Sequence, residues 1–169
     1  MTSVTQPLRD EHKDLLPHIE ALVRVADLVG EAPPDDLHRG IDEVYDFLTH
    51  HLIPHAQAEE RALYPVVARA MGAPEATRTM NRDHVEVGRL TDELGVLRTK
   101  LAAGANGNQR KALRRVLYGL YAVIKVHFAK EEEVYLPLLD QRLGADDARK
   151  MFDAMEAAAG EAKAHAAAQ

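Results

Sequence analysis

The stretch HFAKEEEVYLP, residues 127–137, occurs a second time in related form as HAQAEERALYP, residues 55–65. Both copies read His, any three, Glu-Glu, any four and Pro, so that His55 and His127 occupy equivalent positions of an internal repeat. On an α-helix, residues four apart lie on one face, so each copy directs an imidazole and a carboxylate toward the same point. The stretch therefore predicts a helix that contributes to a metal site, and its repetition predicts a site with two halves.

Apolar residues recur at spacings of three and four along most of the remaining chain. This pattern predicts long amphipathic helices over residues 5–29, 37–71, 75–103 and 109–142. The links between them are short and rich in Gly, Pro and Asn, as at residues 104–108. Four such helices with short links predict an all-α fold, an antiparallel up-down four-helix bundle built from two helix hairpins.

Two further features of the helices are expected from the sequence. Pro17 and Pro54 lie inside predicted helices, where a proline causes a kink or a break. Residues 1–142 are expected to form the bundle. Residues 143–169 are expected to add a short helix over 145–159 and an alanine-rich tail that packs on the bundle or frays.

The composition restricts the chemistry. The 169 residues include no cysteine, which excludes disulfides, thiolate metal sites and iron–sulfur clusters and leaves His and carboxylates as ligands. The net charge of −6 and the absence of a basic run argue against nucleic acid and anionic membranes as partners. No apolar run approaches a membrane span and the first residues do not resemble a signal peptide, so a cytoplasmic location is expected.

The offset between the two copies also connects two histidines outside the repeated motif. His12 lies in the apolar stripe of the first predicted helix, and the same offset leads from it to His84, in the stripe of the third. Each hairpin therefore offers one His from its first helix and a His plus a Glu from its second. Two such hairpins about a pseudo-twofold axis would bring four histidines and two carboxylates to one level of the bundle, which predicts a site for two metal ions.

A purely structural role for these residues is the competing interpretation. A single histidine on an apolar face is more often a hydrogen-bonded core residue than a ligand, and a single His-x-x-x-Glu pair is usually at the surface. The repeat changes this balance, because four buried imidazoles and two buried carboxylates are costly unless they are paired. A pair of bound cations would stabilise all six. The ligand types suit Fe, Mn, Zn or Cu, and the absence of Glu-x-x-His and His-Glu-x-x-His disfavours ferritin-like di-iron and zinc protease sites.

The doubled His-x-x-x-Glu-Glu motif with its trailing proline resembles the hemerythrin-like proteins, the family of the HHE cation-binding domain. The resemblance extends over residues 8–139. It implies a non-haem di-iron centre with an oxo or hydroxo bridge. On matching motif positions, His12 and His55 would bind one iron, His84 and His127 the other, and Glu59 and Glu131 would bridge them.

The sequence departs from the oxygen-carrying members of that family in one respect. Those proteins have a fifth histidine one turn from the histidine of the third helix, whereas Met80 and Gly88 flank His84 at these spacings. Reversible oxygen carriage is therefore not expected, and the position would be taken by water or by His51, one turn before His55. Weaker alternatives for this position are His18, Glu60, Glu132, Tyr45, Tyr118 and Tyr121.

Other residues of the motif are expected to have roles in solvation or packing only. The carboxylates that follow the ligand positions, Glu60, Glu132 and Glu133, are expected on a solvated face. Tyr64 and Tyr135 are expected to pack where each proline ends the core stripe.

The function expected from these features is a non-haem di-iron protein that binds or reacts with O₂, NO or H₂O₂. Weak catalase- or peroxidase-like activity or NO scavenging, in oxidative or nitrosative stress, would follow from a metal pair with an accessible position inside an apolar bundle. No side chain is assigned as catalytic, and no protein partner is identified. Two alternatives stay open, a non-enzymatic oxygen or iron sensor or store, and a structural zinc bundle.

Overall fold

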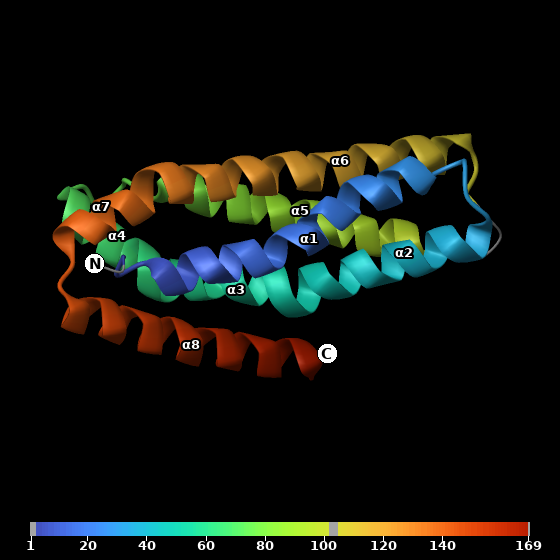
Figure 1. Cartoon of the computed structure of the whole chain (residues 1–169). Helices are drawn as coiled ribbons and strands as arrows, with labels where there is room; N and C mark the ends of the chain where they lie inside the picture. The colour runs from blue at the N-terminus through green and yellow to red at the C-terminus, as the bar shows by residue number, and fades with distance from the viewer. Residues whose placement is uncertain (1–2, 102–104, 169) are drawn as a thin grey trace.

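A computed structural model describes residues 3–101 and 105–168 of the chain. The helical segments join into four long rods and one further helix. In Figure 1 the rods lie side by side, and the further helix runs along their outside. The first and third rods each pack against the second and the fourth, so the four form a ring, and successive rods run in opposite directions. The described residues contain no strand. The predicted all-α antiparallel up-down bundle is confirmed.

The rods begin and end close to the predicted limits. The first is α1 (Gln6–Leu28), and the third is α5 (Arg78–Thr99). The second is one continuous run of α2 (Pro34–Phe47), η1 (Leu48–Leu52), α3 (Ile53–Ala58), η2 (Glu59–Leu63) and α4 (Tyr64–Met71). The fourth consists of α6 (Gly107–Lys130), η3 (Glu131–Tyr135) and α7 (Leu136–Arg142). The segments named η are π-helical turns.

Each π-helical turn ends two residues before a proline, at Pro54, Pro65 and Pro137. A proline lacks the N–H of the ordinary helical bond, and its ring crowds the carbonyl four residues earlier. The wider π-helical turn accommodates this ring without ending the helix. The interruption predicted at Pro54 therefore takes the form of a π-helical turn, and the break considered at Pro17 does not occur, because α1 is continuous through it.

The links between the rods contain residues whose backbone suits a helix end. Gly72 ends α4 with a left-handed conformation (φ 68°), which glycine adopts without a Cβ penalty. Asn106 begins α6 with a capping box, in which its side chain accepts from the N–H of Gln109. Residues 102–104, which include the end of the third predicted helix and Gly104 of the predicted turn, lie outside the described residues.

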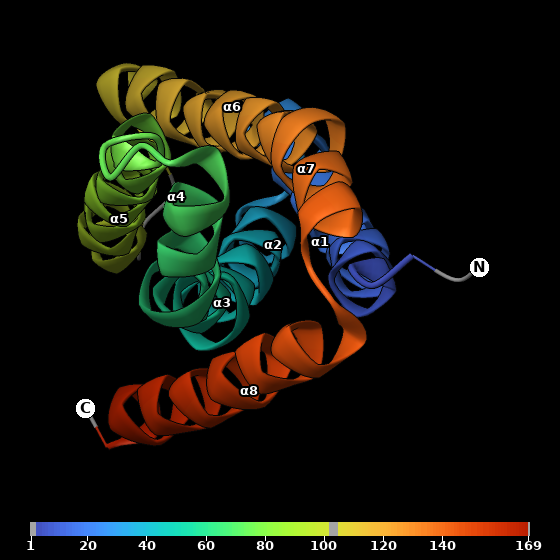
Figure 2. The same cartoon turned by 90° about the vertical axis from the view of Figure 1, so that its left-hand side faces the viewer.

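The fifth helix, α8 (Ala145–Ala167), is longer than the segment 145–159 expected from the sequence, and it includes His165. It lies outside the ring, as the end view in Figure 2 shows, and it packs on α3, η1 and η2 of the second rod. Its buried face consists of small residues and methionines, namely Ala148, Met151, Met155, Ala158 and Ala162. Ala58 and Ala62 belong to the same hydrophobic cluster, so two stripes of short side chains let the helices approach closely.

The buried side chains form two hydrophobic clusters at different levels of the bundle. One cluster includes Ile19, Leu52 and Ile124, and the other includes Leu8, Leu63 and Leu136. Most of the buried polar residues belong to the level between them. The searched part of the chain, which excludes residues 1–2, 102–104 and 169, has no helix that combines the length and the apolarity needed to cross a bilayer.

Candidate metal centre

The six residues singled out by the repeat come together at the level between the two hydrophobic clusters. His12 comes from α1, His55 from α3, His84 from α5 and His127 from α6, while Glu59 and Glu131 are the first residues of η2 and η3. The side chains of Glu59 and Glu131 are at most 1% exposed, and that of His84, the most accessible of the six, is 9% exposed. Each rod of the bundle therefore contributes at least one side chain to a centre that is shielded from water.

Glu59 lies between the two pairs of histidines. Its Oε1 is 3.0 Å from Nε2 of His55 and 3.7 Å from Nε2 of His12. Its Oε2 is 3.3 Å from Nε2 of His84 and 3.8 Å from Nε2 of His127. One carboxylate thus faces both pairs, with one oxygen toward each.

Glu131 has the same relation to one histidine of each pair. Its Oε2 is 3.4 Å from Nε2 of His12, and its Oε1 is 3.4 Å from Nε2 of His127. Two groups of donor atoms are compact enough to hold a cation each, because within each group the atoms lie within 4.8 Å of one another. These groups are His12, His55 and Glu59, and Glu59, His84 and His127.

The hydrogen bonding of the centre fits bound cations. Several buried atoms that point into it have no hydrogen-bond partner, which is costly for groups removed from water. These atoms are Nε2 of His12 and His55, both carboxylate oxygens of Glu59, and Oε2 of Glu131. Nε2 of His84 and Nε2 of His127 are only 3.0 Å apart. Metal ions would satisfy all of these lone pairs at once.

Each histidine has a carboxylate on its outer ring nitrogen. Nδ1 of His12 lies 2.8 Å from Oε1 of Glu132, and Nδ1 of His84 lies 2.8 Å from Oε1 of Glu60. Nδ1 of His55 lies 3.0 Å from Oε1 of Glu11, and Nδ1 of His127 lies 3.1 Å from Oδ2 of Asp83. Because an ionised carboxylate only accepts, each Nδ1–H donates, which leaves Nε2 as the nitrogen that can bind a metal.

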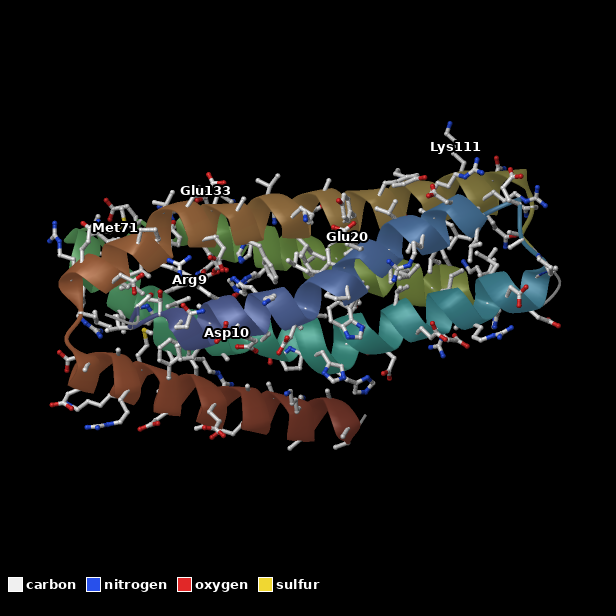
Figure 3. All side chains as sticks on the ribbon, in the orientation of Figure 1. Arg9, Asp10, Glu20, Met71, Lys111 and Glu133 are labelled. Carbon is white, nitrogen blue, oxygen red and sulfur yellow. The ribbon has the colours of Figure 1, made fainter. Side chains whose placement is uncertain are left out.

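These outer partners follow the repeat as well, since Glu60 is equivalent to Glu132, and Glu11 to Asp83. The motif alone predicts a solvated face for Glu60 and Glu132. Their side chains are indeed 39% and 32% exposed, but each also orients a buried histidine, so the purely solvated role is wrong. Glu133 is exposed as expected and points away from the bundle in Figure 3.

The charges in the centre shift the pKa values of its groups. Burial alone would lower the pKa of His127, but the nearby carboxylates of Glu131 and Glu59 raise it to about 10. Burial likewise opposes the charged form of His55, and the charge of Glu59 with the hydrogen bond to Glu11 raises its pKa well above the usual value. Burial would raise the pKa of Glu59, yet the charge of His55 and the proximity of the His12 and His127 imidazoles hold it well below the usual range. The buried carboxylates therefore stabilise positive charge at this point, whether on the imidazoles or on a bound cation.

Tyr64 is a member of the centre that sequence reasoning missed. Its hydroxyl donates to Oε1 of Glu131 at 2.9 Å and lies 3.1 Å from Nε2 of His127 and 3.3 Å from Nε2 of His84. Burial raises its pKa, and the charges of Glu59 and Glu131 raise it further. The assignment of Tyr64 to packing alone is wrong. The available signal was a break in the repeat, because the equivalent position in the other half is Leu136.

The other residues considered for the position of the missing histidine lie elsewhere. His51 is exposed, and its ring is 6.3 Å from that of Phe47, in a groove that His18 also lines. Tyr45 lies under the guanidinium of Arg98. The hydroxyls of Tyr118 and Tyr121 donate to Asp27 and Glu20. None of these interactions involves the six central residues.

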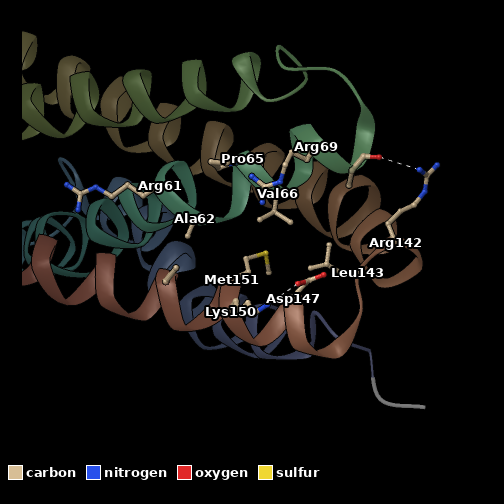
Figure 4. A pocket seen from close by; sticks show the side chains of 12 residues that line it. Arg61, Ala62, Pro65, Val66, Arg69, Arg142, Leu143, Asp147, Lys150 and Met151 are labelled. Carbon is tan, nitrogen blue, oxygen red and sulfur yellow. Dashed lines mark hydrogen bonds and ion pairs between the residues drawn. The ribbon is translucent and has the colours of Figure 1, made fainter.

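A small cavity adjoins the centre. Besides His55, Glu59, His84 and His127, it is lined by Leu52, Ala56, Val87, Ile124 and Phe128. The space open to the centre of a water-sized molecule is about 20 Å³, which is room for about one small molecule. The larger cleft of Figure 4, about 690 Å³ between α4, α7 and α8, has Val66 and Met151 on its walls and no residue of the centre.

Comparison with known proteins finds one matching family. The model of the family described as the hemerythrin HHE cation binding domain matches residues 3–139, and a second, overlapping match covers residues 89–168. The first match contains all six central residues and Tyr64. No curated protein and no solved structure matches the chain.

Proposed function

Because the chain belongs to the hemerythrin HHE cation-binding family, we propose that it binds two non-haem iron ions and uses them to bind or react with O₂, NO or H₂O₂. His12 and His55 would hold one iron, and His84 and His127 the other. Glu59 and Glu131 would bridge the two ions, together with an oxo or hydroxo group. The observation that carries this proposal is the set of buried, unpaired Nε2 and carboxylate atoms that face one another.

The surroundings of the centre support small molecules as ligands. When bound, a pair of irons supplies redox chemistry shared between two ions and a site for a small exogenous ligand. The chain supplies the rest. The outer carboxylates orient the four imidazoles, while Leu52, Val87 and Ile124 give the adjoining cavity apolar walls that restrict the size and charge of what enters. Peroxide disproportionation, weak peroxidase-like turnover and NO scavenging are the reactions proposed.

One observation favours a second candidate, a non-enzymatic sensor or store. Helix α8 packs on α3 and η2, the two segments that carry His55 and Glu59. Occupancy of the metal centre could therefore change the position of α8, which a partner would recognise. A structural zinc bundle is the third alternative, since four imidazoles and two carboxylates also suit Zn²⁺.

Metal analysis with an absorption spectrum tests the proposal. We expect close to two irons per chain after loading, with the near-ultraviolet and visible absorption of an oxo-bridged di-ferric pair. Oxygen release from H₂O₂ or consumption of NO would then identify a catalyst, whereas loading without turnover would favour a sensor. Zinc as the sole tightly bound metal would contradict the di-iron proposal.

Two substitutions test the ligand assignment. His127→Ala and Glu131→Ala each remove a donor from the buried centre, so both variants should lose most of their iron. His51→Ala is the matched control, because His51 is exposed and outside the centre, and it should retain two irons. Full iron occupancy in both test variants would show that the assignment is wrong.

A further inference from the structure

The lining of the cavity beside the centre does not follow the twofold repeat of the bundle. Leu52, His55 and Ala56 line it together with their repeat equivalents Ile124, His127 and Phe128. The other lining residues are Glu59, His84 and Val87, whose repeat equivalents do not line the cavity. No described residue of α1 lines it. The space therefore lies on the side of α5 and His84.

The pair Ala56 and Phe128 accounts for this asymmetry. They occupy equivalent positions of the repeat, each directly after a histidine of the centre. The ring of Phe128 stacks on His12, with the ring centroids 4.2 Å apart and an interplanar angle of 21°. Ala56 offers only a methyl group to the corresponding space beside His84. Phe128 thus fills the space on this side of His12, whereas Ala56 leaves the equivalent space beside His84 open.

Tyr64 covers His84 from another segment of the chain. Its ring stacks on His84 with centroids 5.5 Å apart and an interplanar angle of 18°, and its position in the sequence follows Glu59 by five. Tyr64 does not line the cavity. At Gly88, one turn after His84, an added Cβ would meet no atom within 4 Å, so α5 places no side chain at this position. His84 thus has an aromatic cover on one side and open, apolar space on the other.

We infer that the exogenous small molecule binds in the half of the centre held by His84 and His127, entering through the cavity past Ala56, while Phe128 closes the half held by His12 and His55. This inference rests on the proposed function, because it needs a metal in each half. Ala56 and Phe128 are specificity-determining residues on this view, since neither offers a donor atom to a metal. The ligand class is a neutral molecule of two to four atoms, because the walls are apolar and the space admits about one water-sized molecule.

Exchange of the two side chains across the repeat tests the inference. The probe is NO, mixed with the iron-loaded, anaerobically reduced protein, and the binding rate is followed by absorption in a stopped-flow instrument. Ala56→Phe fills the open half and should slow NO binding by about tenfold or more, which corresponds to a barrier higher by about 1.4 kcal/mol. Ala122→Phe is the matched control, because Ala122 is exposed on α6, and its rate should equal that of the unmodified protein.

The double variant Ala56→Phe/Phe128→Ala keeps the total side-chain volume and moves the space to the half with His12. It should recover most of the lost rate, because the second half then becomes accessible. Ala56→Val, which protrudes less, should give an intermediate rate and serves if the phenylalanine variant does not fold.

The inference is overturned if Ala56→Phe or Ala56→Val protein with two irons binds NO as fast as the unmodified protein. In that case the di-iron proposal survives, because the iron count is measured on the same samples. A chain that takes up no iron would overturn the proposed function and this inference together.

Discussion

At the scale of the residue, the centre consists of four pairs, each made of one imidazole and one outer carboxylate. Each buried imidazole has a carboxylate on Nδ1, and Nε2 faces inward. The outer carboxylate fixes the tautomer and the orientation of the ring and increases the basicity of the inner nitrogen. If the four histidines bind metal as proposed, these outer carboxylates would affect how tightly the metal is held.

Glu132→Gln tests this role. The amide keeps the shape of the side chain but removes the charge beside Nδ1 of His12, so metal affinity should fall by about tenfold to a hundredfold. Competition against a chelator measures the affinity. Glu133→Gln is the matched control, since Glu133 is the exposed neighbour on the same turn. Equal affinities of the two variants would show that Glu132 is dispensable.

The contribution of the Tyr64 hydroxyl to stability can be tested on the metal-free protein. Tyr64→Phe removes a hydrogen bond to the buried Glu131, so unfolding by urea should require about 1–3 kcal/mol less free energy. Tyr135→Phe removes a bond to a backbone carbonyl instead and should cost about 1 kcal/mol or less. An unchanged stability of Tyr64→Phe would mean that Glu131 finds another donor.

The residues of the centre differ in how far the sequence could predict them. The repeat connects His12 to His84 and Glu59 to Glu131, so their meeting at one level could be predicted from spacing alone, although their role as ligands stays a proposal. Tyr64 could not be predicted, because its equivalent Leu136 breaks the repeat and because a long side chain can reach the centre from the next turn. The role of Glu60 depended on which way a half-exposed side chain turns, which periodicity does not determine.

At the scale of the element, the prolines shape the rods without ending them. The hydrophobic period predicted the four rods and their order, because it depends only on which face is buried. The three π-helical turns were not predicted. They depend on how the backbone relieves the crowding of a proline ring, and a kink, a break and a π-helical turn all do so.

The start of α1 is fastened to α7 by Asp140. Its carboxylate accepts from the hydroxyls of Ser3 and Thr5 and from the N–H of Thr5, and it lies 3.4 Å from Arg9. Burial would raise the pKa of Asp140, but these hydrogen bonds lower it below the usual value. The ionised carboxylate thus stabilises the folded state, and its contribution is complete above the pKa of an unfolded aspartate and is lost as the pH falls through the lower, folded pKa.

Asp140→Asn should therefore destabilise the protein most at neutral pH, by about 1–2 kcal/mol. The difference from the unmodified protein should shrink as the pH falls below about 4, where an unfolded aspartate becomes protonated, and should disappear only below the lower pKa of folded Asp140. Urea unfolding at a series of pH values measures this. Asp153→Asn, on the exposed face of α8, is the control and should behave like the unmodified protein. A destabilisation that is the same at every pH would contradict the proposed role of the charge.

At the scale of the whole molecule, the polar level interrupts an otherwise apolar interior. Its unpaired buried atoms destabilise the metal-free fold, and bound metal would compensate for them. The sequence predicted the overall architecture well because both hairpins obey one pattern. It predicted the last helix less well, since the buried face of α8 is made of alanine and methionine and lacks a clear stripe of large apolar residues.

Removal of iron should lower the melting temperature. A ligand present at a hundredfold excess over its Kd stabilises the folded state by about 2.7 kcal/mol per site. For a chain of this length, each kcal/mol corresponds to about 2–4 °C. Calorimetry should therefore find the metal-free protein less stable by at least about 5 °C. Equal melting temperatures would contradict a metal site in the core.

The separation of the interior into two hydrophobic clusters has a consequence for folding cooperativity. In most small domains one continuous core makes unfolding all-or-none, whereas here the clusters around Leu22 and Leu63 lie on opposite sides of the polar level. Metal ions bound by the six central residues would tie all four rods together at that level and couple the two clusters. Without them, the two ends of the bundle should open as separate units, and amide hydrogen exchange should report two opening free energies where the loaded protein reports one.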